Sequence, residues 1–200
     1  MATRVVNPVS LTILAHSHLG ANMATSRFKT DMYPAERFVE SAGTILFRLS
    51  TREVCILHSH QSDEYVLPKG RRNLGESRQA TATRETTEET GVPCRLLPVD
   101  LLSRVCPAIE TEHMPDETRL FKSVCEPIAV HTRHIGEGEM KLIWWFVAAV
   151  NEGEPIHQHE DKFKVEFHSC DAVLQKLTFA VDRELVKKAI GLVQSTLDFQ

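Results

Sequence analysis

The sequence predicts one α+β domain over residues 37–200, preceded by a flexible N-terminal arm over residues 1–36. Three observations support this fold class. Runs of β-branched and aromatic residues are interspersed with three segments of helical periodicity. The 200 residues are enough for one substantial core but few for two. Residues 1–36 are polar and lack a sustained apolar period, as is typical of loose chain ends.

The first half of the domain predicts a hairpin, a short strand, a loop and a helix. A polar turn at residues 50–52 separates two β-rich runs, and Pro68 ends a third. A glycine-flanked loop over residues 70–75 precedes the helix, for which Ser77 is a suitable N-cap and Gly91 a suitable C-terminal stop. The expected elements are strands at 42–49, 53–58 and 65–67 and a helix at 77–90.

The second half predicts three more strands and two helices. Pro98 and Pro107 are expected to interrupt and end the first of these strands, because proline lacks a backbone N–H. The expected strands cover 94–105, 121–131 and 141–150, with connections at 108–118, 132–140 and 151–162. The expected helices cover 171–177 and 181–197.

Composition and charge exclude several classes of protein. Apolar residues make up 42% and charged residues 25%, which argues against disorder. A net charge of −4 argues against a generally basic nucleic-acid-binding protein, and apolar runs stay far below the roughly 18 residues of a membrane span. Five cysteines without paired spacing predict reduced thiols. With no clear signal peptide, we expect a cytoplasmic protein, with the nucleus as an alternative and secretion left open.

The helix at 77–90 is unusually acidic. At about 100° per residue, Glu85, Glu88 and Glu89 gather on one side. Like charges at these spacings destabilise a helix by about 0.2–0.5 kcal/mol per pair. A divalent cation such as Mg²⁺ or Mn²⁺ would turn this repulsion into ligation, although a solvated acidic face is the alternative. The small residues expected to pack against the sheet on the opposite side are Ala80, Thr83, Thr86, Thr87 and Thr90.

The surroundings of this helix add a specific spacing of glycine, arginine and glutamate over residues 70–92. Its constrained positions are Gly70, Glu76, Arg84, Glu85, Thr86, Glu88, Glu89, Gly91 and Val92. This pattern resembles the Nudix box, with one departure at Thr86, where that family usually has a larger aliphatic residue. The resemblance implies a Nudix-type α/β/α sandwich, with a mixed β-sheet between helices, and hydrolysis of a diphosphate linkage.

The resemblance also implies roles for individual residues. Glu85 and Glu89 would be ligands of Mg²⁺ or Mn²⁺, and Glu88 would be the general base or a further ligand. Glu76 would assist from the outer shell or through a further cation, and Arg84 would orient Glu88 by a charge-assisted hydrogen bond. Gly70 would allow the backbone to approach the metal or the phosphate closely.

Basic residues beside the box predict how an anionic substrate is held. Lys69, Arg71 and Arg72 flank Gly70 and are interpreted, with it, as a phosphate clamp, the alternative being a solvated basic loop. Lys141 is a further candidate for substrate binding. In the similar diphosphoinositol polyphosphate phosphohydrolases, a basic residue at the start of the comparable strand contacts the substrate.

The predicted substrate is a small, phosphate-rich anion. Inositol pyrophosphates are the leading hypothesis, with diadenosine polyphosphates as second substrates, because the residues near the box are cationic rather than aromatic. The alternatives are a nucleotide-specific pyrophosphatase acting on a dinucleoside polyphosphate, a capped RNA end or a nucleotide sugar, and a non-catalytic Nudix-like binding module. Neither a membrane nor nucleic acid other than a capped RNA end is expected as a partner, and the residue pattern indicates no oligomeric state.

Overall fold

The structure is a computed structural model, and it describes residues 27–109, 115–158 and 160–197. Of the predicted N-terminal arm, residues 1–26 lie outside these ranges. The described end of the arm is largely exposed and includes a short 3-10 helix, Ala35–Arg37. The elements discussed below belong to one unit of the chain, Tyr33–Gln200.

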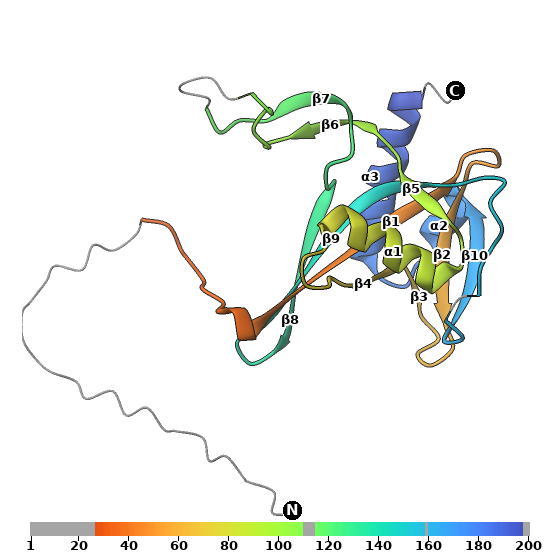
Figure 1. The fold of residues 1–200 in the computed structure, drawn as a ribbon, viewed down its shortest axis with the longest axis horizontal. Coiled ribbons are helices and arrows are strands. Elements are labelled where there is room, and N and C mark those ends of the chain that lie inside the picture. The colour runs from red at the N-terminus through yellow and green to blue at the C-terminus, as the bar shows by residue number, and fades with distance from the viewer. Residues whose placement is uncertain (1–26, 110–114, 159, 198–200) are drawn as a thin grey trace, which may run out of the picture. The chain divides into compact units, whose positions relative to one another are not determined.

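A mixed β-sheet forms the centre of this unit (Figure 1). β1 and β9 are parallel, and the other described strand pairs of the sheet are antiparallel. The main path of the sheet runs β10 (Phe163–Ser169), β2 (Glu53–Ser59), β1 (Phe38–Arg48), β9 (Glu139–Val150) and β5 (Cys94–Leu96). Off this path, β3 (Tyr65–Val66) pairs with β2, β4 (Lys69–Arg71) with β1, and β8 (Ala129–Gly136) with β9.

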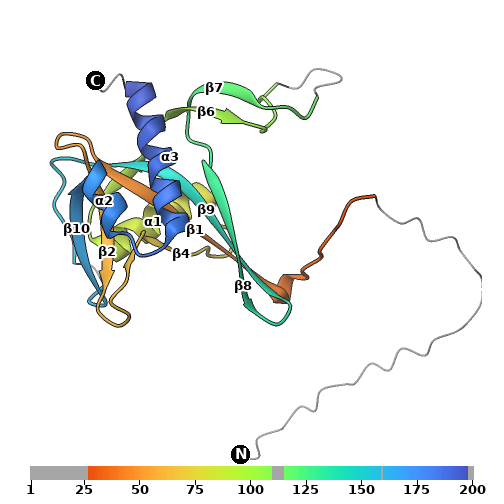
Figure 2. The same cartoon turned by 180° about the vertical axis from the view of Figure 1, so that it is seen from behind.

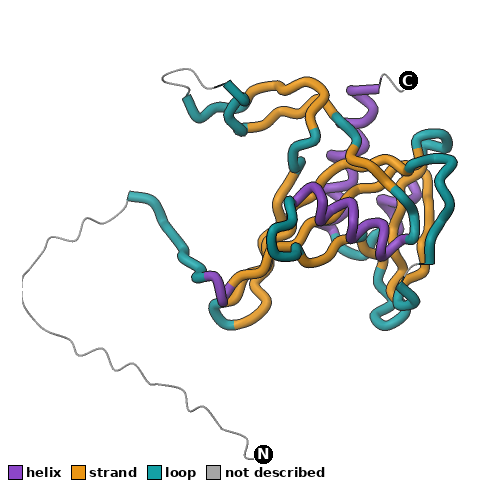
Figure 3. Tube along the Cα trace, in the orientation of Figure 1, coloured by secondary structure: helices purple, strands orange, loops and turns teal. Residues whose placement is uncertain are grey.

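Helices cover both faces of the sheet. α1 (Arg78–Thr90) lies on one face, and α2 (Cys170–Lys176) and α3 (Ala180–Leu197) lie on the other, as the two opposite views show (Figures 1 and 2). Figure 3 shows the same layering by type of element. This confirms the predicted α/β/α sandwich with a mixed sheet. None of the described helices combines the length and apolarity needed to cross a lipid bilayer.

The alternation of side chains along the central strands explains the two layers. Ala42 of β1 and Phe146 of β9 pack with Ala82 of α1. The adjacent Trp145 points to the other face and joins the large core cluster that includes Val186 of α3. Because successive side chains of a strand face opposite sides, β1 and β9 must be apolar along most of their length.

Helix α1 begins and ends as its sequence predicts. The Ser77 hydroxyl accepts the N–H of Ala80, and Gly91 adopts a left-handed conformation with φ of 69° while its N–H donates to the Thr87 carbonyl oxygen. The predicted division of the helix into faces was right for Thr86 and Thr90, which are buried, and wrong for Ala80 and Glu89. The buried residues of α1 are Thr81, Ala82, Thr86, Glu89 and Thr90.

The physical reason is that α1 is enclosed on more than one side. It packs against β1 and β9 of the sheet and also against β4, β5 and β10. The enclosing elements bury Glu89, which the predicted faces had placed opposite the sheet, whereas Ala80 is exposed. Thr86 lies at the centre of the contact, where its hydroxyl hydrogen-bonds that of Thr44 on β1 at 2.9 Å.

Prolines divide two of the predicted strands. The run over 94–105 splits at Pro98 into β5 and β6 (Val99–Ser103), and the run over 121–131 splits at Pro127 into β7 (Arg119–Val124) and β8. β6 and β7 pair with each other as a separate two-stranded sheet. The connection between them includes residues 110–114, which lie outside the described ranges.

Two other predictions about the second half were wrong. Residues 132–140, expected as a connection, mostly belong to the hairpin of β8 and β9, whose turn contains Gly138 with φ of 69°. β10 was missed altogether, although Phe163, Val165 and Phe167 alternate with polar residues as a half-buried strand requires. Its position after a long polar loop concealed this short signal.

Candidate functional site

β4 and α1 bring the predicted site residues together beside the sheet. β4 pairs with β1, which places Gly70 opposite Ala42 and against the flank of α1. A Cβ atom added to Gly70 would lie 1.8 Å from Oε2 of Glu85. Glycine is therefore required at this position to leave room for the Glu85 carboxylate.

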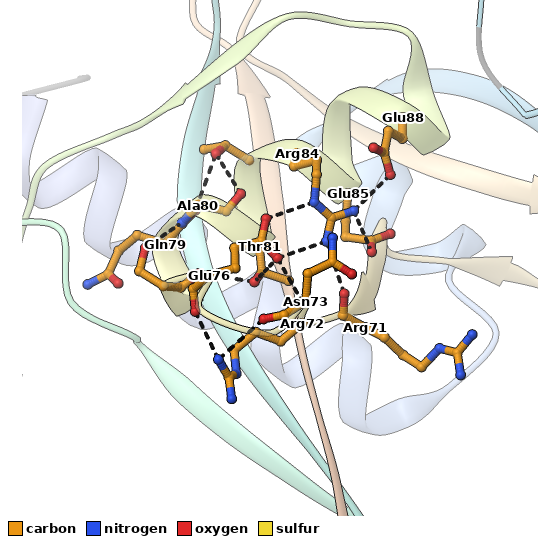
Figure 4. Close-up of polar contacts among 12 residues, drawn as sticks. Arg71, Arg72, Asn73, Glu76, Gln79, Ala80, Thr81, Arg84, Glu85 and Glu88 are labelled. Atoms are coloured by element: carbon orange, nitrogen blue, oxygen red, sulfur yellow. Dashed lines mark hydrogen bonds and ion pairs between the residues drawn. The ribbon is translucent and has the colours of Figure 1, made fainter.

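Arg84 is the centre of the acidic cluster (Figure 4). Its Nε and Nη2 donate to the two carboxylate oxygens of Glu76 at 2.8 and 3.0 Å. Its Nη1 donates to Glu85 at 2.8 Å and to Glu88 at 2.9 Å, and Nη2 also donates to the carbonyl oxygen of Arg71 at 3.0 Å. One guanidinium group thus fixes the relative positions of three carboxylates of the box.

Glu76 is the most strongly stabilised carboxylate of this group. The hydrogen bond from Arg84 lowers its pKa to about 2, against the opposing effect of burial, and the Asn73 N–H and the Thr81 hydroxyl contribute further. The interaction is mutual, because Glu76 and then Glu85 raise the pKa of Arg84. Glu76 therefore stays ionised and holds the loop after β4 against the helix.

Glu89 has a different environment from the other three glutamates. The residue is 4% exposed, and its carboxylate accepts the backbone N–H of Lys69 at 2.7 Å. Its ion-pair partner is Lys162, whose Nζ lies 3.9 Å from Oε1 of Glu89. Burial raises the pKa of Glu89 to about 7 despite these two lysines. A buried carboxylate with such distant compensation is a place where a bound cation would stabilise the charge.

Glu160 is a carboxylate of this region that the sequence analysis missed. Its backbone N–H donates to the carbonyl oxygen of Glu88 at 3.3 Å, its side chain pairs with Lys162, and its negative charge contributes to the raised pKa of Glu89. It precedes β10 in an acidic stretch that carries no motif of its own. The only signal in the sequence was the position of this carboxylate just before a strand, and the strand, β10, was not predicted.

The donor set fits a divalent cation that prefers oxygen ligands. Glu85, Glu88 and Glu89 come from one helix, and Gly70 leaves the space beside Glu85 free of a side chain. Within the described residues, no three carboxylate, histidine or cysteine side chains already converge as a metal site. Arg84 holds Oε1 of Glu85 and Oε2 of Glu88, so the second oxygen of each carboxylate is not bonded to this guanidinium and could serve as a ligand.

Basic side chains gather on the side of the site that Lys69 occupies. Lys141 of β9 is half-buried, and burial, followed by the charges of Lys69, Arg133 and Arg71, lowers its pKa, while Glu89 has the opposite effect. The Arg71 side chain is exposed and extends away from the Arg84 cluster (Figure 4). Lys69, Arg71 and Lys141, all predicted to bind substrate, are therefore brought together next to Glu89, and Arg133 joins them.

Arg72 was predicted as the third cation of the clamp, and the structure places it elsewhere. Its Nε donates to Glu40 at 3.0 Å and its Nη1 to the carbonyl oxygen of Glu76 at 3.0 Å. An arginine engaged in this way is a poor partner for substrate, because binding phosphate would first break an ion pair. The sequence could not reveal this, because Glu40 lies 32 positions earlier in the chain.

On the α3 face of the sheet, several buried polar atoms near Lys69 have no hydrogen-bond partner. Among the described residues these are Ser41 Oγ, His131 Nδ1, Trp145 Nε1 and Asp182 Oδ1. His131 Nδ1 lies 4.0 Å from Asp182 Oδ1, and its ring meets Trp145 edge-on at a centroid distance of 5.7 Å. Burial raises the pKa of Asp182, an effect that Arg133, His131 and Lys69 reduce. The sequence analysis assigned no role to this cluster.

The layered fold, the acidic helix and the adjacent cations together define a candidate site for a phosphate compound and a divalent cation. Comparison with known proteins identifies the family. The sequence matches the NUDIX domain over residues 37–189, so the chain belongs to the Nudix family. Hydrolases of this family generally use a divalent metal such as Mg²⁺.

Several individual proteins are similar to this chain. An 8-oxo-(d)GTP phosphatase of Mycolicibacterium smegmatis is 24% identical over 163 residues, which cover 76% of this chain and 41% of that protein. The chain thus spans well under half the length of this relative. The structure of a C. elegans Ap4A hydrolase binary complex superposes with a TM-score of 0.55 at 17% identity, covering 78% of this chain and 98% of that one. The structure of a Nudix hydrolase from Nitrosomonas europaea superposes with a TM-score of 0.50 at 14% identity, covering 81% of this chain and 95% of that one.

Proposed function

We propose that this Nudix hydrolase cleaves the diphosphate linkage of a nucleoside polyphosphate. The observation that carries the proposal is the juxtaposition, around Lys69, of a cationic group with a buried polar and aromatic cluster. Lys69, Arg71 and Lys141 suit the phosphate chain. Trp145, His131 and Asp182, whose charge Lys69 influences, carry buried polar atoms without a hydrogen-bond partner among the described residues, and such atoms suit the polar edge of a base rather than a phosphate.

The carboxylates of α1 supply the catalytic half of the site. Glu85 and Glu89 would hold a divalent cation such as Mg²⁺ or Mn²⁺, with Glu160 available as a further oxygen ligand. When bound, the cation neutralises phosphate oxygens and lowers the pKa of water. Glu88 acts as the base, because Arg84 holds its Oε2 while the side chain stays 52% exposed, so that Oε1 can take a proton from water. Glu76 keeps Arg84 in place.

The names of two similar proteins support this substrate class. One relative is an 8-oxo-(d)GTP phosphatase and one structural neighbour is an Ap4A hydrolase, so nucleotide substrates occur among proteins of this fold and sequence. Inositol pyrophosphates remain the second candidate, and the clustering of Lys69, Arg71, Lys141 and Arg133 favours them. The withdrawal of Arg72 into its ion pair with Glu40 weakens that candidate, because it removes one cation from the predicted clamp.

A substrate panel tests the proposal. The purified protein is incubated with Mg²⁺ and, in separate reactions, with 8-oxo-dGTP, Ap4A, an inositol pyrophosphate and a capped RNA, and kcat/KM is measured by chromatography of the products. We expect a nucleoside polyphosphate to exceed the inositol pyrophosphate at least about tenfold, equivalent to about 1.4 kcal/mol. The opposite ranking would favour the second candidate. No turnover of any substrate with Mg²⁺ or Mn²⁺ would indicate a binding module.

A matched pair of variants tests the base-binding cluster. Asp182→Ala should raise KM for the preferred nucleotide about tenfold or more, because it removes a buried hydrogen-bonding group, and should change kcat less. Asp171→Ala, which removes an exposed carboxylate at the start of α2, is the control and should leave both constants unchanged. Equal effects of the two substitutions would remove the argument for a base at this position.

A further inference from the structure

Glu40 on β1 lies outside the Nudix box and accepts an unusual number of hydrogen bonds. Its side chain is 14% exposed. Oε1 accepts Nε and Nη2 of Arg78 at 3.0 and 2.7 Å and Nε1 of Trp144 at 3.0 Å, and Oε2 accepts Nε of Arg72 at 3.0 Å. The two arginines and the indole together outweigh the effect of burial, so the pKa of Glu40 is lowered. The carboxylate is therefore ionised and fully engaged.

The position of Glu40 matters because its partners lie at the two ends of one loop. Arg72 directly follows β4, and Arg78 is the first residue of α1. The five residues between them form the loop of the box that contains Glu76. Glu40 therefore ties the beginning and the end of this loop to the central strand of the sheet. Arg78 is also held by Trp144, because its guanidinium lies over the indole ring at 4.0 Å from the ring centroid.

A continuous series of contacts connects Glu40 with the catalytic carboxylates. Arg72 is held by Glu40 and donates through Nη1 to the carbonyl oxygen of Glu76. Both carboxylate oxygens of Glu76 hold Arg84, and Arg84 holds Glu85 and Glu88 (Figure 4). The orientation of Glu85 and Glu88 thus depends on the position of Glu76, which depends on the closure of the loop.

We infer that Glu40 is a positioning residue for hydrolysis, which clamps the loop over residues 72–78 so that Glu76 and Arg84 hold Glu85 and Glu88 in place. The inference rests on the roles proposed above for these two glutamates. It also explains why Arg72 is not part of the phosphate clamp, since its charge serves to close the loop. Glutamine cannot replace Glu40, because its amide exchanges one acceptor oxygen for an NH₂ group, whose two N–H donors would face partners that are all donors.

Glu40→Gln tests the inference, with Glu53→Gln as a matched control. Glu53 on β2 also forms an ion pair with an arginine, Arg48, at 3.3 Å, and its side chain is 29% exposed. This ion pair does not involve the loop over residues 72–78. We expect Glu40→Gln to lower kcat about tenfold or more. KM should change less than about threefold, because the basic side chains proposed to bind the substrate are untouched. Mn²⁺ affinity, measured by calorimetry, should fall several-fold. Glu53→Gln should leave kcat, KM and Mn²⁺ affinity unchanged.

Thermal unfolding of both variants separates a structural effect from a positioning effect. If Glu40→Gln loses thermal stability like Glu53→Gln but keeps normal kcat and Mn²⁺ affinity, Glu40 is an ordinary ion pair and the inference is wrong. Should Glu40→Gln fail to fold, Trp144→Phe removes a single hydrogen bond to Glu40 and keeps a ring beneath Arg78. It should lower kcat about twofold to threefold, and unchanged kcat and Mn²⁺ affinity would contradict the inference.

The Mn²⁺ measurement also keeps this test independent of the substrate. If the wild-type protein turns over no nucleotide, the proposed function fails, but a loss of Mn²⁺ affinity in Glu40→Gln and not in Glu53→Gln still supports the positioning role. If the wild type is active and the two variants bind Mn²⁺ and turn over substrate equally well, the positioning role fails while the proposed function stands.

Discussion

Glu89 differs from the other glutamates of the box in being almost completely buried. Arg84 compensates the charges of Glu76, Glu85 and Glu88, whereas Glu89 has a backbone N–H and a more distant lysine. In the absence of metal, the ionised Glu89 therefore costs folding free energy that the others do not. The same environment would favour a bound cation strongly, because a cation removes that cost.

Replacing Glu89 by glutamine should separate activity from stability. Glu89→Gln should abolish turnover, because a ligand is lost, yet raise the thermal midpoint of the metal-free protein at pH 8, because a buried charge disappears. The glutamine carbonyl can still accept the Lys69 N–H. Differential scanning calorimetry and steady-state kinetics at saturating Mg²⁺ are the measurements. Near-normal turnover in this variant would show that Glu89 is not a ligand.

At the scale of elements, the contact between β4 and α1 decides the geometry of the site. β4 is a strand of three residues, and it is held by its pairing with β1 and by the hydrogen bond from Lys69 to Glu89. Gly70 faces Glu85 so closely that any larger side chain would overlap the Glu85 carboxylate. The short strand therefore works as a spacer between α1 and the proposed phosphate-binding residues Lys69 and Arg71.

Gly70→Ala should disturb this spacing more than it disturbs folding. The added Cβ would overlap the Glu85 carboxylate, which must move out of the hydrogen bond with Arg84. We expect kcat to fall by about 100-fold or more, with a loss of stability of about 1–3 kcal/mol, as for local overpacking. Steady-state kinetics and urea unfolding are the measurements, with Gly191→Ala, at a position of α3 where an added Cβ meets nothing within 4 Å, as the control for loss of a glycine. Similar kinetics in the two variants would contradict the spacing role.

At the scale of the whole molecule, β10 and α2 close the far edge of the sheet through a group of charges. Glu166 of β10 accepts from Lys164 at 2.9 Å, from His168 at 2.7 Å and from Lys176 of α2 at 3.1 Å. Hydrogen bonds from Lys164, His168 and Lys176 outweigh burial and lower the pKa of Glu166 to about 2. This ion-pair group ties the helical layer to the sheet.

The lowered pKa of Glu166 predicts how stability depends on pH. A folded-state pKa below the ordinary value of 4.5 means that the contribution is complete above about pH 4.5 and is lost as the pH falls towards 2. Glu166→Gln should reduce stability at pH 7 by on the order of 1–2 kcal/mol, with allowance for the exposed Lys164. Urea unfolding at pH 7, 5 and 3 should show that the difference in free energy of unfolding between the wild type and Glu166→Gln shrinks at pH 3. A constant difference at all three values would contradict the assignment.

The sequence alone was sufficient for the class of fold, the family and the residues of the acidic helix. These depend on local information: the capping of α1 by Ser77 and Gly91, the apolar runs of β1 and β9, and the fixed spacing from Gly70 to Val92. The break at Pro98 was predicted, but Pro127 divided a strand that looked continuous, and β10 was missed, because periodicity in short segments does not reveal which strand will supply a partner.

Only the tertiary structure decided which charged residues face one another. Residues as distant in sequence as Glu40 and Trp144 meet because β1 and β9 are parallel neighbours, and Glu89 is buried because β4 and the loop before β10 close over one side of α1. Arg72 and Arg71 are adjacent and chemically identical, yet Arg72 closes a loop while the Arg71 side chain stays exposed. Ion pairing acts through space, so its partners are determined by packing rather than by spacing along the chain.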